Sequence, residues 1–521
     1  MGPFPRMSEW GRPGADDVDT PPGLAGTVLR GASYGGLGYG LSQALTLGIY
    51  VVLARLIEPD EFGDFAAATV LIGFTLLVTE TGMMSAIVQR RDRLEEAANT
   101  ALVATFAAGI GFSIVLLAFS PLVGAFFDSD RVQALAAATS GLIFLRTAVV
   151  VPDALLWRRF SFLRRLVIEP AQVIAFGFAS ILAATSDLGA WSLVAGQYAS
   201  HGTELILAWA LARWRPRPGL ATVTMWRELV GYGRHVFFAT TILRAGEQSD
   251  AVVIGKLLGS GALGQFRYAV RVASTPFLLI LAAATFALFP AFARISHDAD
   301  RMRAAFLRSL RWMMALAAPA GLVLVALGLQ ATVLVFGDVW RPAGYAAMAM
   351  AGFAVGGAVT SLVSELLRSQ ERPSSLTPMH ATTAVATIGA MAALSEVSLS
   401  AAAAGLSIGP CLGAAYGVRV AHRVTGLALG TLVDAIARPV AAAALMSGAV
   451  LAFDRLLVDA ADMATFPGLA FLAGEALLAI GIYVLALRLI SPVTAKELGG
   501  AIGGALRGVF RRLRGPEGET S

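Results

Sequence analysis

The stretch Ala54–Phe65 reads ARLIEPDEFGDF, and the stretch Gly255–Phe266 reads GKLLGSGALGQF. The two stretches align without a gap at an offset of 201 residues, and the match continues at Ala68 and Ala269. Each stretch joins two long hydrophobic segments. An internal repeat of this kind predicts a chain built from two equivalent halves.

The composition around these stretches indicates a membrane protein. Of the 521 residues, 56% are hydrophobic and only 14% are charged, and the mean hydropathy is +0.70. Soluble globular domains carry about 25% charged residues, so the composition excludes an ordinary soluble chain. The single cysteine, Cys411, lies in a hydrophobic run and excludes an intrachain disulfide.

Hydrophobic runs divide the chain into fourteen candidate transmembrane helices, since about 20 apolar residues suffice for one crossing. Six crossings separate the repeat copies, and an even number gives both copies the same orientation. We therefore predict an all-α polytopic membrane protein with two parallel, pseudo-symmetric six-helix lobes and a two-helix C-terminal extension. The predicted spans are 29–56, 62–88, 100–120, 133–156, 166–186, 190–211, 228–255, 262–289, 308–334, 343–367, 376–396, 400–420, 436–457 and 466–489.

The spans group into units with a tail at each end. A proline-rich tail without the apolar core of a signal peptide is expected to be disordered. In the last unit, Leu498, Ile502 and Leu506 recur at helical spacing among arginines, which is typical of a helix on an anionic membrane surface; a frayed basic tail is the alternative. The units are a disordered cytoplasmic tail at 1–28, an N-lobe at 29–211, a C-lobe at 228–420, the last two spans at 436–489 and a basic amphipathic cytoplasmic tail at 490–521.

Positive side chains alternate between the two ends of the predicted spans. With the N-terminal side taken as inside, the inner tails and loops hold 30 arginines and lysines. The outer connections hold five, which are Arg55, Arg131, Lys256, Arg341 and Arg455. Because positive loops stay in the cytoplasm, both termini are expected there. The alternation also supports an even number of spans.

The first repeat copy and the segment after it resemble a known family. The run ARLIEPDEFG at 54–63, followed by Gly82 and by SAIVQRRD at 85–92, is similar to the opening of the Wzx-type lipid-linked oligosaccharide flippases. These proteins belong to the multidrug/oligosaccharidyl-lipid/polysaccharide superfamily. The motif covers roughly the first 65 residues of the membrane region, and it carries over no substrate-contact residue.

The resemblance implies a function as well as a fold. The lobes would form a V around a central cavity and carry an undecaprenyl-pyrophosphate-linked oligosaccharide from the cytoplasmic to the periplasmic leaflet of the bacterial inner membrane by alternating access. The product would serve surface or exopolysaccharide biosynthesis. The implied partners are the lipid-linked oligosaccharide and membrane lipids, with a polysaccharide polymerase and chain-length proteins as further candidates. No nucleic acid, cofactor or metal is expected beyond a coupling proton or sodium ion.

Five arginines inside predicted spans are candidates for binding the pyrophosphate, because an arginine at mid-bilayer costs at least ~2.5–3.5 kcal/mol and usually faces a cavity or a partner. Guanidinium groups contact phosphate oxygens bidentately and remain charged. Salt bridges between helices, or snorkelling to the interface, are the structural alternatives. The candidates are Arg244, Arg271, Arg146, Arg267 and Arg234; Arg267 and Arg271 are four residues apart and share a helix face.

Three acidic residues inside predicted spans are candidates for ion coupling. Glu80 lies in the second span, and Glu247 and Asp250 lie in the seventh. A carboxylate whose solvation differs between two conformations can bind a proton on one side and release it on the other, and a sodium site could use the same oxygens. The alternative is an internal salt bridge with Arg244 or another arginine.

The sequence argues against an enzyme. Asp128-Ser129-Asp130 has the form of the metal-binding pair of many glycosyltransferases, but it occupies a short connection with no nucleotide-sugar domain around it. The outer connections are short, whereas membrane-embedded glycan polymerases usually carry a sizeable external loop. The alternatives that remain are a membrane-embedded polymerase or transferase acting on lipid-linked glycans, a peptidoglycan-precursor flippase and a drug exporter.

Overall fold

The regular elements of the described residues are all helices. The computed structural model describes residues 24–90, 92–158, 167–294, 298–370, 375–457 and 465–500. Within these ranges there is no strand, in agreement with the all-α fold that the hydrophobic runs predict. The helices are α1 (Leu24–Leu56), α2 (Pro59–Gln89), α3 (Leu94–Phe127), α4 (Asp130–Thr139), α5 (Gly141–Arg158), α6 (Glu169–Ala184), α7 (Ala190–Ala212), η3 (Pro218–Leu220), α8 (Val223–Arg294), α9 (Ala299–Phe336), η4 (Asp338–Trp340), α10 (Arg341–Ala349), α11 (Gly352–Ser369), α12 (Leu376–Ser395), α13 (Leu399–Ala403), α14 (Gly405–Thr425), α15 (Leu429–Leu457) and α16 (Thr465–Ile490).

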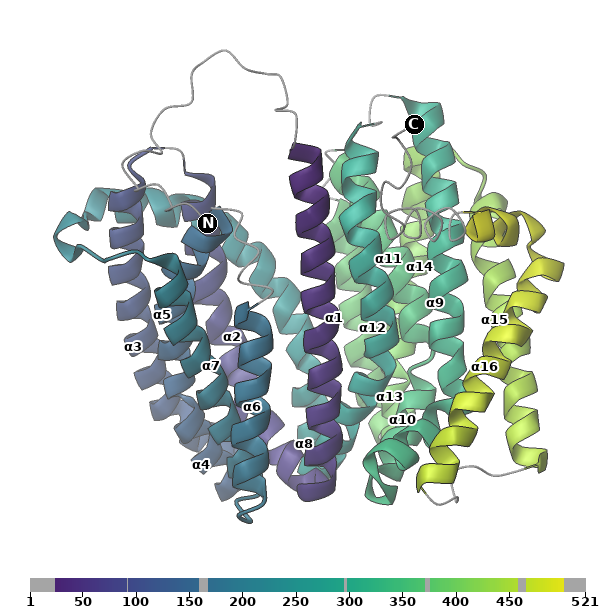
Figure 1. Ribbon diagram of the computed structural model, residues 1–521, viewed down its shortest axis with the longest axis horizontal. Helices are drawn as coiled ribbons and strands as arrows, with labels where there is room; N and C mark the ends of the chain where they lie inside the picture. The colour runs from purple at the N-terminus through teal and green to yellow at the C-terminus, as the bar shows by residue number, and fades with distance from the viewer. Residues whose placement is uncertain are drawn as a thin grey trace, which may run out of the picture.

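The helices form two halves that stand side by side (Figure 1). Helices α2–α7 lie on one side and α9–α16 on the other, with α1 between them. In the first half, α6 packs on α7 and α3 packs on α5; in the second half, α12 packs on α14 and α9 packs on α15. One buried apolar cluster lies within the second half, and another joins residues of both halves, including Phe62 and Phe266.

Several helices are long and apolar enough to cross a membrane. Among the described residues six qualify, which are Leu94–Phe127, Asp130–Arg158, Ala299–Phe336, Leu399–Thr425, Leu429–Leu456 and Pro467–Ile490. A seventh is added if α10 and α11, which meet at 46°, form one bent span. Each of the fourteen predicted segments falls mainly in helix. The protein is therefore a multi-pass membrane protein.

Helix α8 contains two of the predicted spans, 228–255 and 262–289. It has 72 residues, and the backbone of Gly259 inside it is not helical, with φ 88° and ψ 174°. Only glycine adopts this combination at little cost, because a Cβ atom would clash with the neighbouring backbone. Gly259 therefore divides α8 into a first arm, 223–258, and a second arm, 260–294. In the 201-residue repeat, this turn is equivalent to the connection between α1 and α2.

The two halves touch where these two turns meet. A Cβ atom built on Gly63 of α2 would overlap the carbonyl oxygen of Ser260 in α8 and lie 3.0 Å from the amide nitrogen of Gly264. Backbones can approach this closely only when both residues lack side chains. Because α1 runs toward this turn, the contact lies at the lower end of the molecule in Figure 1.

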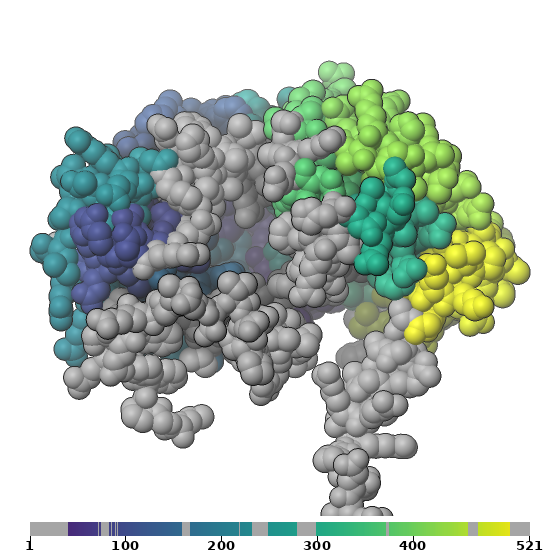
Figure 2. Space-filling model, turned by 90° about the horizontal axis from the view of Figure 1, so that it is seen from above, coloured from purple at the N-terminus to yellow at the C-terminus, as the bar shows by residue number. Residues whose placement is uncertain are grey.

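Charged side chains reinforce this end, which we call the closed end and define by Arg55, Gly63, Lys256 and Gly264. Arg55 donates a hydrogen bond to the carbonyl oxygen of Leu334, at 3.2 Å, near the C-terminus of α9. Lys256 forms an ion pair with Asp128, at 2.8 Å, directly after α3. The first contact joins α1 to α9, and the second joins the first arm of α8 to the end of α3. Seen from the opposite end, the molecule has a hollow between its halves (Figure 2).

The chain ends differ in detail from the predicted boundaries. Helix α1 begins at Leu24, before the predicted start of the first span at residue 29, and residues 1–23 of the predicted tail lie outside the described residues. At the other end, residues 492–500 are helical. The rest of the predicted amphipathic tail, 501–521, also lies outside the described part of the chain.

Candidate functional site

Arg271 stands on the second arm of α8 where this arm faces α1. Its guanidinium carbon lies 3.2 Å from the ring centroid of Tyr50 in α1. A guanidinium stacked on an aromatic face keeps its charge, and its edge remains available to an anion. Among the side chains that the structure describes, no carboxylate lies within ion-pair distance of Arg271. Arg271 is half-buried. Its positive charge therefore lies between the halves, with no acidic partner among the described side chains.

Arg267 lies one helical turn closer to Gly259 and has a different surrounding. Its guanidinium is 3.6 Å from the carboxylate of Asp250 and donates a hydrogen bond of 3.2 Å to the side-chain oxygen of Gln248. Both partners belong to the first arm of α8. The turn at Gly259 therefore folds the second arm back onto the first. This ion pair corresponds to one of the two roles considered for Asp250, that of an internal salt bridge.

Aromatic rings fill the space between the arginines and the closed end. Tyr268 is central: its ring centroid lies 3.8 Å from that of Trp340 and 5.0 Å from that of Phe62. Its hydroxyl donates to the carbonyl oxygen of Tyr50, at 3.2 Å. We call this set the aromatic cluster; it consists of Tyr50, Phe62, Phe176, Tyr268, Phe336 and Trp340.

The aromatic cluster joins helices that are far apart in the sequence. Trp340, fully buried, donates its indole N–H to the carbonyl oxygen of Ala54, at 2.9 Å. Aromatic pairs of this kind contribute ~0.5–1.5 kcal/mol each beyond their area burial. The cluster therefore packs helices from both halves together between Arg271 and the closed end. Sequence reasoning missed it, because no local pattern marks rings that meet only in the folded chain.

The remaining predicted site residues are placed less completely. Arg146 is half-buried in α5, a helix that packs against α2, α3 and α7, and it makes interactions of its own. Arg234, Arg244 and Glu247 belong to the first arm of α8, and Glu80 belongs to α2, but their side chains lie outside the described set. The structure thus pairs Arg267 with Asp250 and places Arg271 one helical turn further along the same arm; the role of all these residues stays a prediction.

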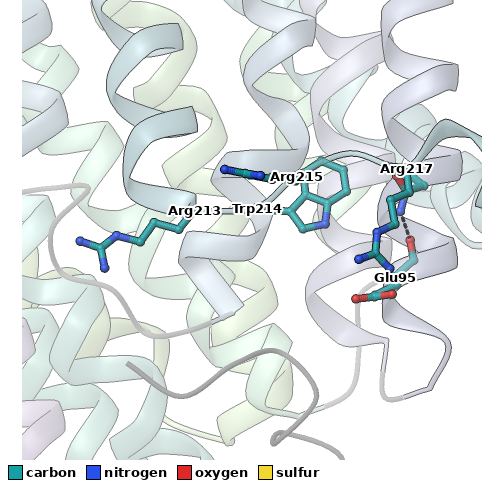
Figure 3. A pocket seen from close by; sticks show the side chains of 6 residues that line it. Glu95, Arg213, Trp214, Arg215 and Arg217 are labelled. Carbon is teal, nitrogen blue, oxygen red and sulfur yellow. Dashed lines mark hydrogen bonds between the residues drawn. The ribbon is translucent and has the colours of Figure 1, made fainter. Parts of the chain in front are cut away.

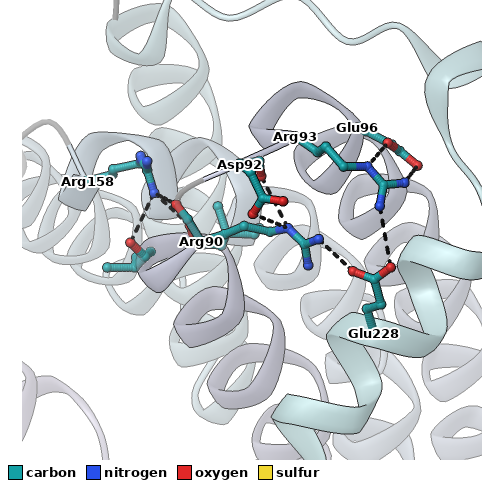
Figure 4. Close-up of polar contacts among 8 residues, drawn as sticks. Arg90, Asp92, Arg93, Glu96, Arg158 and Glu228 are labelled. Carbon is teal, nitrogen blue, oxygen red and sulfur yellow. Dashed lines mark hydrogen bonds and ion pairs between the residues drawn. The ribbon is translucent and has the colours of Figure 1, made fainter. Parts of the chain in front are cut away.

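A second group of charges lies at the end of the molecule opposite the closed end. Arg90, after α2, forms an ion pair of 2.6 Å with Glu228 near the start of α8, and Arg93 approaches the same carboxylate at 3.4 Å (Figure 4). Arg93 also binds Glu96 at 2.7 Å, and this hydrogen bond raises the pKa of the Arg93 guanidinium above its ordinary value. Arg158 donates to the carbonyl oxygens of Val88 and Arg90.

This charge network fastens the beginning of α8 to the first half. Thr222, just before α8, donates to Glu96 at 2.7 Å, and its amide donates to Thr100 of α3 at 3.1 Å. Met225 and Leu229 pack into the apolar cluster of α3 and α5. The first arm of α8 therefore starts on the first half, although the sequence predicts that 228–420 belongs to the second lobe.

A small basic cavity lies beside the network. It has a volume of about 200 Å³ and is lined by three arginines of the segment between α7 and α8 together with residues of α3 (Figure 3). Trp214 is buried, and the amide of Arg217 donates to the side-chain oxygen of Asn99. In the described residues, no group of three histidine, cysteine, aspartate or glutamate side chains could hold a metal ion. The lining is Glu95, Asn99, Arg213, Trp214, Arg215 and Arg217.

The fold is shared with solved membrane transporters. The lipid II flippase MurJ, in an inward closed conformation, superposes with a TM-score of 0.68 over 87% of this chain and 98% of that chain, at 13% identity. A multidrug resistance MATE family transporter of the MOP superfamily, in an inward-facing conformation, gives a TM-score of 0.57 over 75% and 94%, at 14% identity. At this identity the likeness concerns the fold alone. The class is thus a multi-pass membrane protein with a MurJ-like and MATE-like fold.

Sequence comparisons define the family. The family described as polysaccharide biosynthesis protein matches residues 52–345, more than half of the chain. The succinoglycan biosynthesis transport protein ExoT of Rhizobium meliloti is 28% identical over 62% of this chain and 65% of its own length. The lipopolysaccharide biosynthesis protein WzxC of Escherichia coli is 24% identical over 60% and 64%. The chain thus matches slightly less than two thirds of these relatives. It belongs to the polysaccharide biosynthesis protein family, and the predicted resemblance to Wzx-type transporters is confirmed.

Proposed function

We propose that the protein is a flippase that moves an undecaprenyl-pyrophosphate-linked oligosaccharide from the cytoplasmic to the periplasmic leaflet by alternating access, for surface or exopolysaccharide biosynthesis. The names of the relatives support a glycan substrate, since they refer to succinoglycan and lipopolysaccharide. The transporter folds of the solved neighbours favour transport over catalysis. A membrane-embedded polymerase or transferase has no comparable support.

We further propose that all fourteen predicted segments cross the bacterial inner membrane, with both termini in the cytoplasm. The N-lobe at 29–211 and the C-lobe at 228–420 would then be parallel copies, and 436–489 would be an extension. The reciprocal contact of Gly63 and Gly264 supports this arrangement, and so does the distribution of arginines. In this orientation the closed end faces the periplasm, and the hollow opens toward the cytoplasm.

The observation that carries the proposal is the position of Arg271. Its half-buried guanidinium stacks on Tyr50 at 3.2 Å, and it stands about 18 Å along the second arm from Gly259. This is near the middle of a hydrocarbon core about 30 Å thick. A diphosphate in that environment needs a fixed cation, and arginine supplies two hydrogen bonds in one plane. Arg267, Arg244, Arg146 and Arg234 are proposed as further contacts along the path.

The proposal is tested by replacing Arg271 in a strain that lacks the native gene. Arg271→Ala should cause lipid-linked intermediate to accumulate on the cytoplasmic leaflet and should lower surface glycan at least tenfold, whereas Arg271→Lys should retain part of the activity. The measurement is quantification of the lipid-linked intermediate together with surface glycan at matched expression.

Arg438→Ala is the matched control, because Arg438 is exposed and pairs with Asp434 within one helix. Normal glycan in the Arg271→Ala strain would refute the binding role. Accumulation of the peptidoglycan precursor instead of an oligosaccharide intermediate would show that the proposed substrate is wrong and that the precursor is transported.

We propose that ion coupling involves Glu80, Glu247 and Asp250. Asp250 lies 3.6 Å from Arg267, which places one of the three acids next to a candidate pyrophosphate contact. Transport into proteoliposomes should lose its dependence on a proton or sodium gradient in Glu247→Gln or Glu80→Gln. A gradient dependence that stays the same in both variants would exclude these two acids.

A further inference from the structure

A buried acid stands in the two-helix extension, away from the site described above. Glu475 belongs to α16, and only 2% of its surface is exposed. Neither of its carboxyl oxygens has a hydrogen-bond partner among the described atoms. Helix α16 packs on α9 and α15, and buried apolar residues of all three helices form one cluster there.

The location of Glu475 in its own helix is informative. Helix α16 is strongly apolar, and only 22% of its most apolar window is buried inside the protein, so most of its surface is available to lipid. Its single acidic residue nevertheless points into the protein. An acid is retained at such a position at a cost, because an isolated carboxylate in a low-dielectric interior is penalised by several kcal/mol and neutralises instead.

A second acid lies near the first. Asp454, near the end of α15, is 5% exposed and lies within electrostatic range of Glu475. A nearby negative charge opposes the ionisation of a buried carboxyl group and so favours its protonated form. In α9, the side-chain oxygen of Gln330 is another buried acceptor without a partner in the described structure.

The other charged groups around Glu475 do not neutralise it. The stretch 320–334 of α9 contains no titratable side chain. On α15, Arg455 is exposed. On α16, Arg488 is about 20 Å away along the helix, and Tyr483 donates its hydroxyl proton to the carbonyl oxygen of Ala315, at 2.7 Å. Among the described residues, the only charged group placed to affect Glu475 is therefore the acid Asp454.

We propose that Glu475 is a proton-binding site in the two-helix extension, buried where α16 packs on α9 and α15. The ligand is a proton and not a metal cation, because even Glu475 and Asp454 together offer fewer oxygens than the six or more that a hard cation prefers. This site is distinct from the candidate coupling acids Glu80, Glu247 and Asp250. Its test measures protonation and does not depend on the transported substrate.

The experiment is infrared difference spectroscopy of the full chain in lipid nanodiscs, recorded over a pH series. The wild-type protein should show the C=O stretching band of a protonated carboxyl at neutral pH, and the band should vanish reversibly as the pH rises. Glu475→Gln should lack this band. In Asp454→Asn the band should vanish at lower pH, because one negative charge that opposes ionisation is gone.

Glu365→Gln is the matched control, because Glu365 is also a buried acid in a helix but has an ion pair with Arg368 at 3.1 Å. This variant should keep the band. Glu475→Leu is a second variant that should lack the band and be at least as stable as the wild type, since it removes two unpartnered polar atoms. A band that persists in both Glu475 variants would overturn the proposal. Loss of the wild-type band when sodium replaces choline at constant pH would overturn it in favour of a cation site.

Discussion

Gly63 and Gly264 occupy the same position of the 201-residue repeat, and each rests on the backbone of the other's half. A Cβ atom on Gly63 would overlap the carbonyl oxygen of Ser260, and one on Gly264 would overlap that of Pro59. Pro59 and Ser260 are themselves equivalent positions. Contacts that exchange partners in this way are what two equivalent halves related by a two-fold axis would make, which is the arrangement proposed above.

Alanine at either glycine should destabilise the closed end. The added methyl group meets backbone rather than a flexible side chain, so α2 and α8 must separate, and overpacking of this kind costs ~1–3 kcal/mol. Gly63→Ala and Gly264→Ala should each lower the melting temperature in detergent and reduce surface glycan. Gly48→Ala is the control, because a methyl group at Gly48 would meet no atom within 4 Å. Equal melting temperatures for all three variants would contradict the close contact.

Gly259→Ala should destabilise the protein through the backbone alone. A Cβ atom at Gly259 would meet no atom within 4 Å, yet the residue has φ 88° in a region that is essentially restricted to glycine. The expected cost is of the order of 1–3 kcal/mol, measured by thermal unfolding. Gly389→Ala, which is also in open space but within helix α12, should be neutral or stabilising. A Gly259→Ala protein as stable as the Gly389→Ala protein would exclude the strained turn.

The pairing of Arg267 with Asp250 predicts non-additive effects. The side chains are 32% and 12% exposed, so removing one partner leaves the other charge partly buried and unpaired. In a double-mutant cycle of Arg267→Gln and Asp250→Asn, the coupling energy should be about 0.5–3 kcal/mol. Thermal or denaturant unfolding of the four proteins provides the measurement. Additivity within about 0.5 kcal/mol would show that the two groups do not interact.

Glu228 should hold the start of α8 on the first half in a salt-dependent manner. Glu228→Gln removes the acceptor of Arg90 and Arg93, whose ion pairs are partly exposed and therefore weak and sensitive to salt. Hydrogen exchange of the amides at 223–231 should therefore accelerate at low salt, and the difference from wild type should shrink at high salt because of screening.

Asp434→Asn is the control for this change. It breaks the ion pair with Arg438, which lies within a single helix and does not join two elements. It should leave exchange at 223–231 unchanged. A Glu228→Gln protein with wild-type exchange there at low salt would mean that the apolar contacts of Met225 and Leu229 hold the segment without the charges.

The candidate site was only partly accessible to sequence reasoning. The spacing of Arg267 and Arg271 placed both on one helix face, because helical periodicity is local. It did not reveal that Tyr50, 221 residues earlier, stacks on Arg271, or that Asp250 and Gln248 take up Arg267. Arg90 and Arg93 counted only as positive loop residues, yet they bind Glu228. The sequence also did not reveal that Glu475 is buried with no hydrogen-bond partner among the described atoms.

The sequence by itself determined that this chain is an all-helical membrane protein with an internal repeat. Both conclusions rest on properties that each segment carries alone: apolar composition decides whether a segment can enter lipid, because water is absent there and the backbone must satisfy its own hydrogen bonds. The tertiary structure alone decided which charges are neutralised, which rings close one end and, among the described atoms, that both carboxyl oxygens of Glu475 lack a hydrogen-bond partner. These depend on atoms from distant segments meeting within a few ångströms, and the energy of such contacts exists only after the helices have packed.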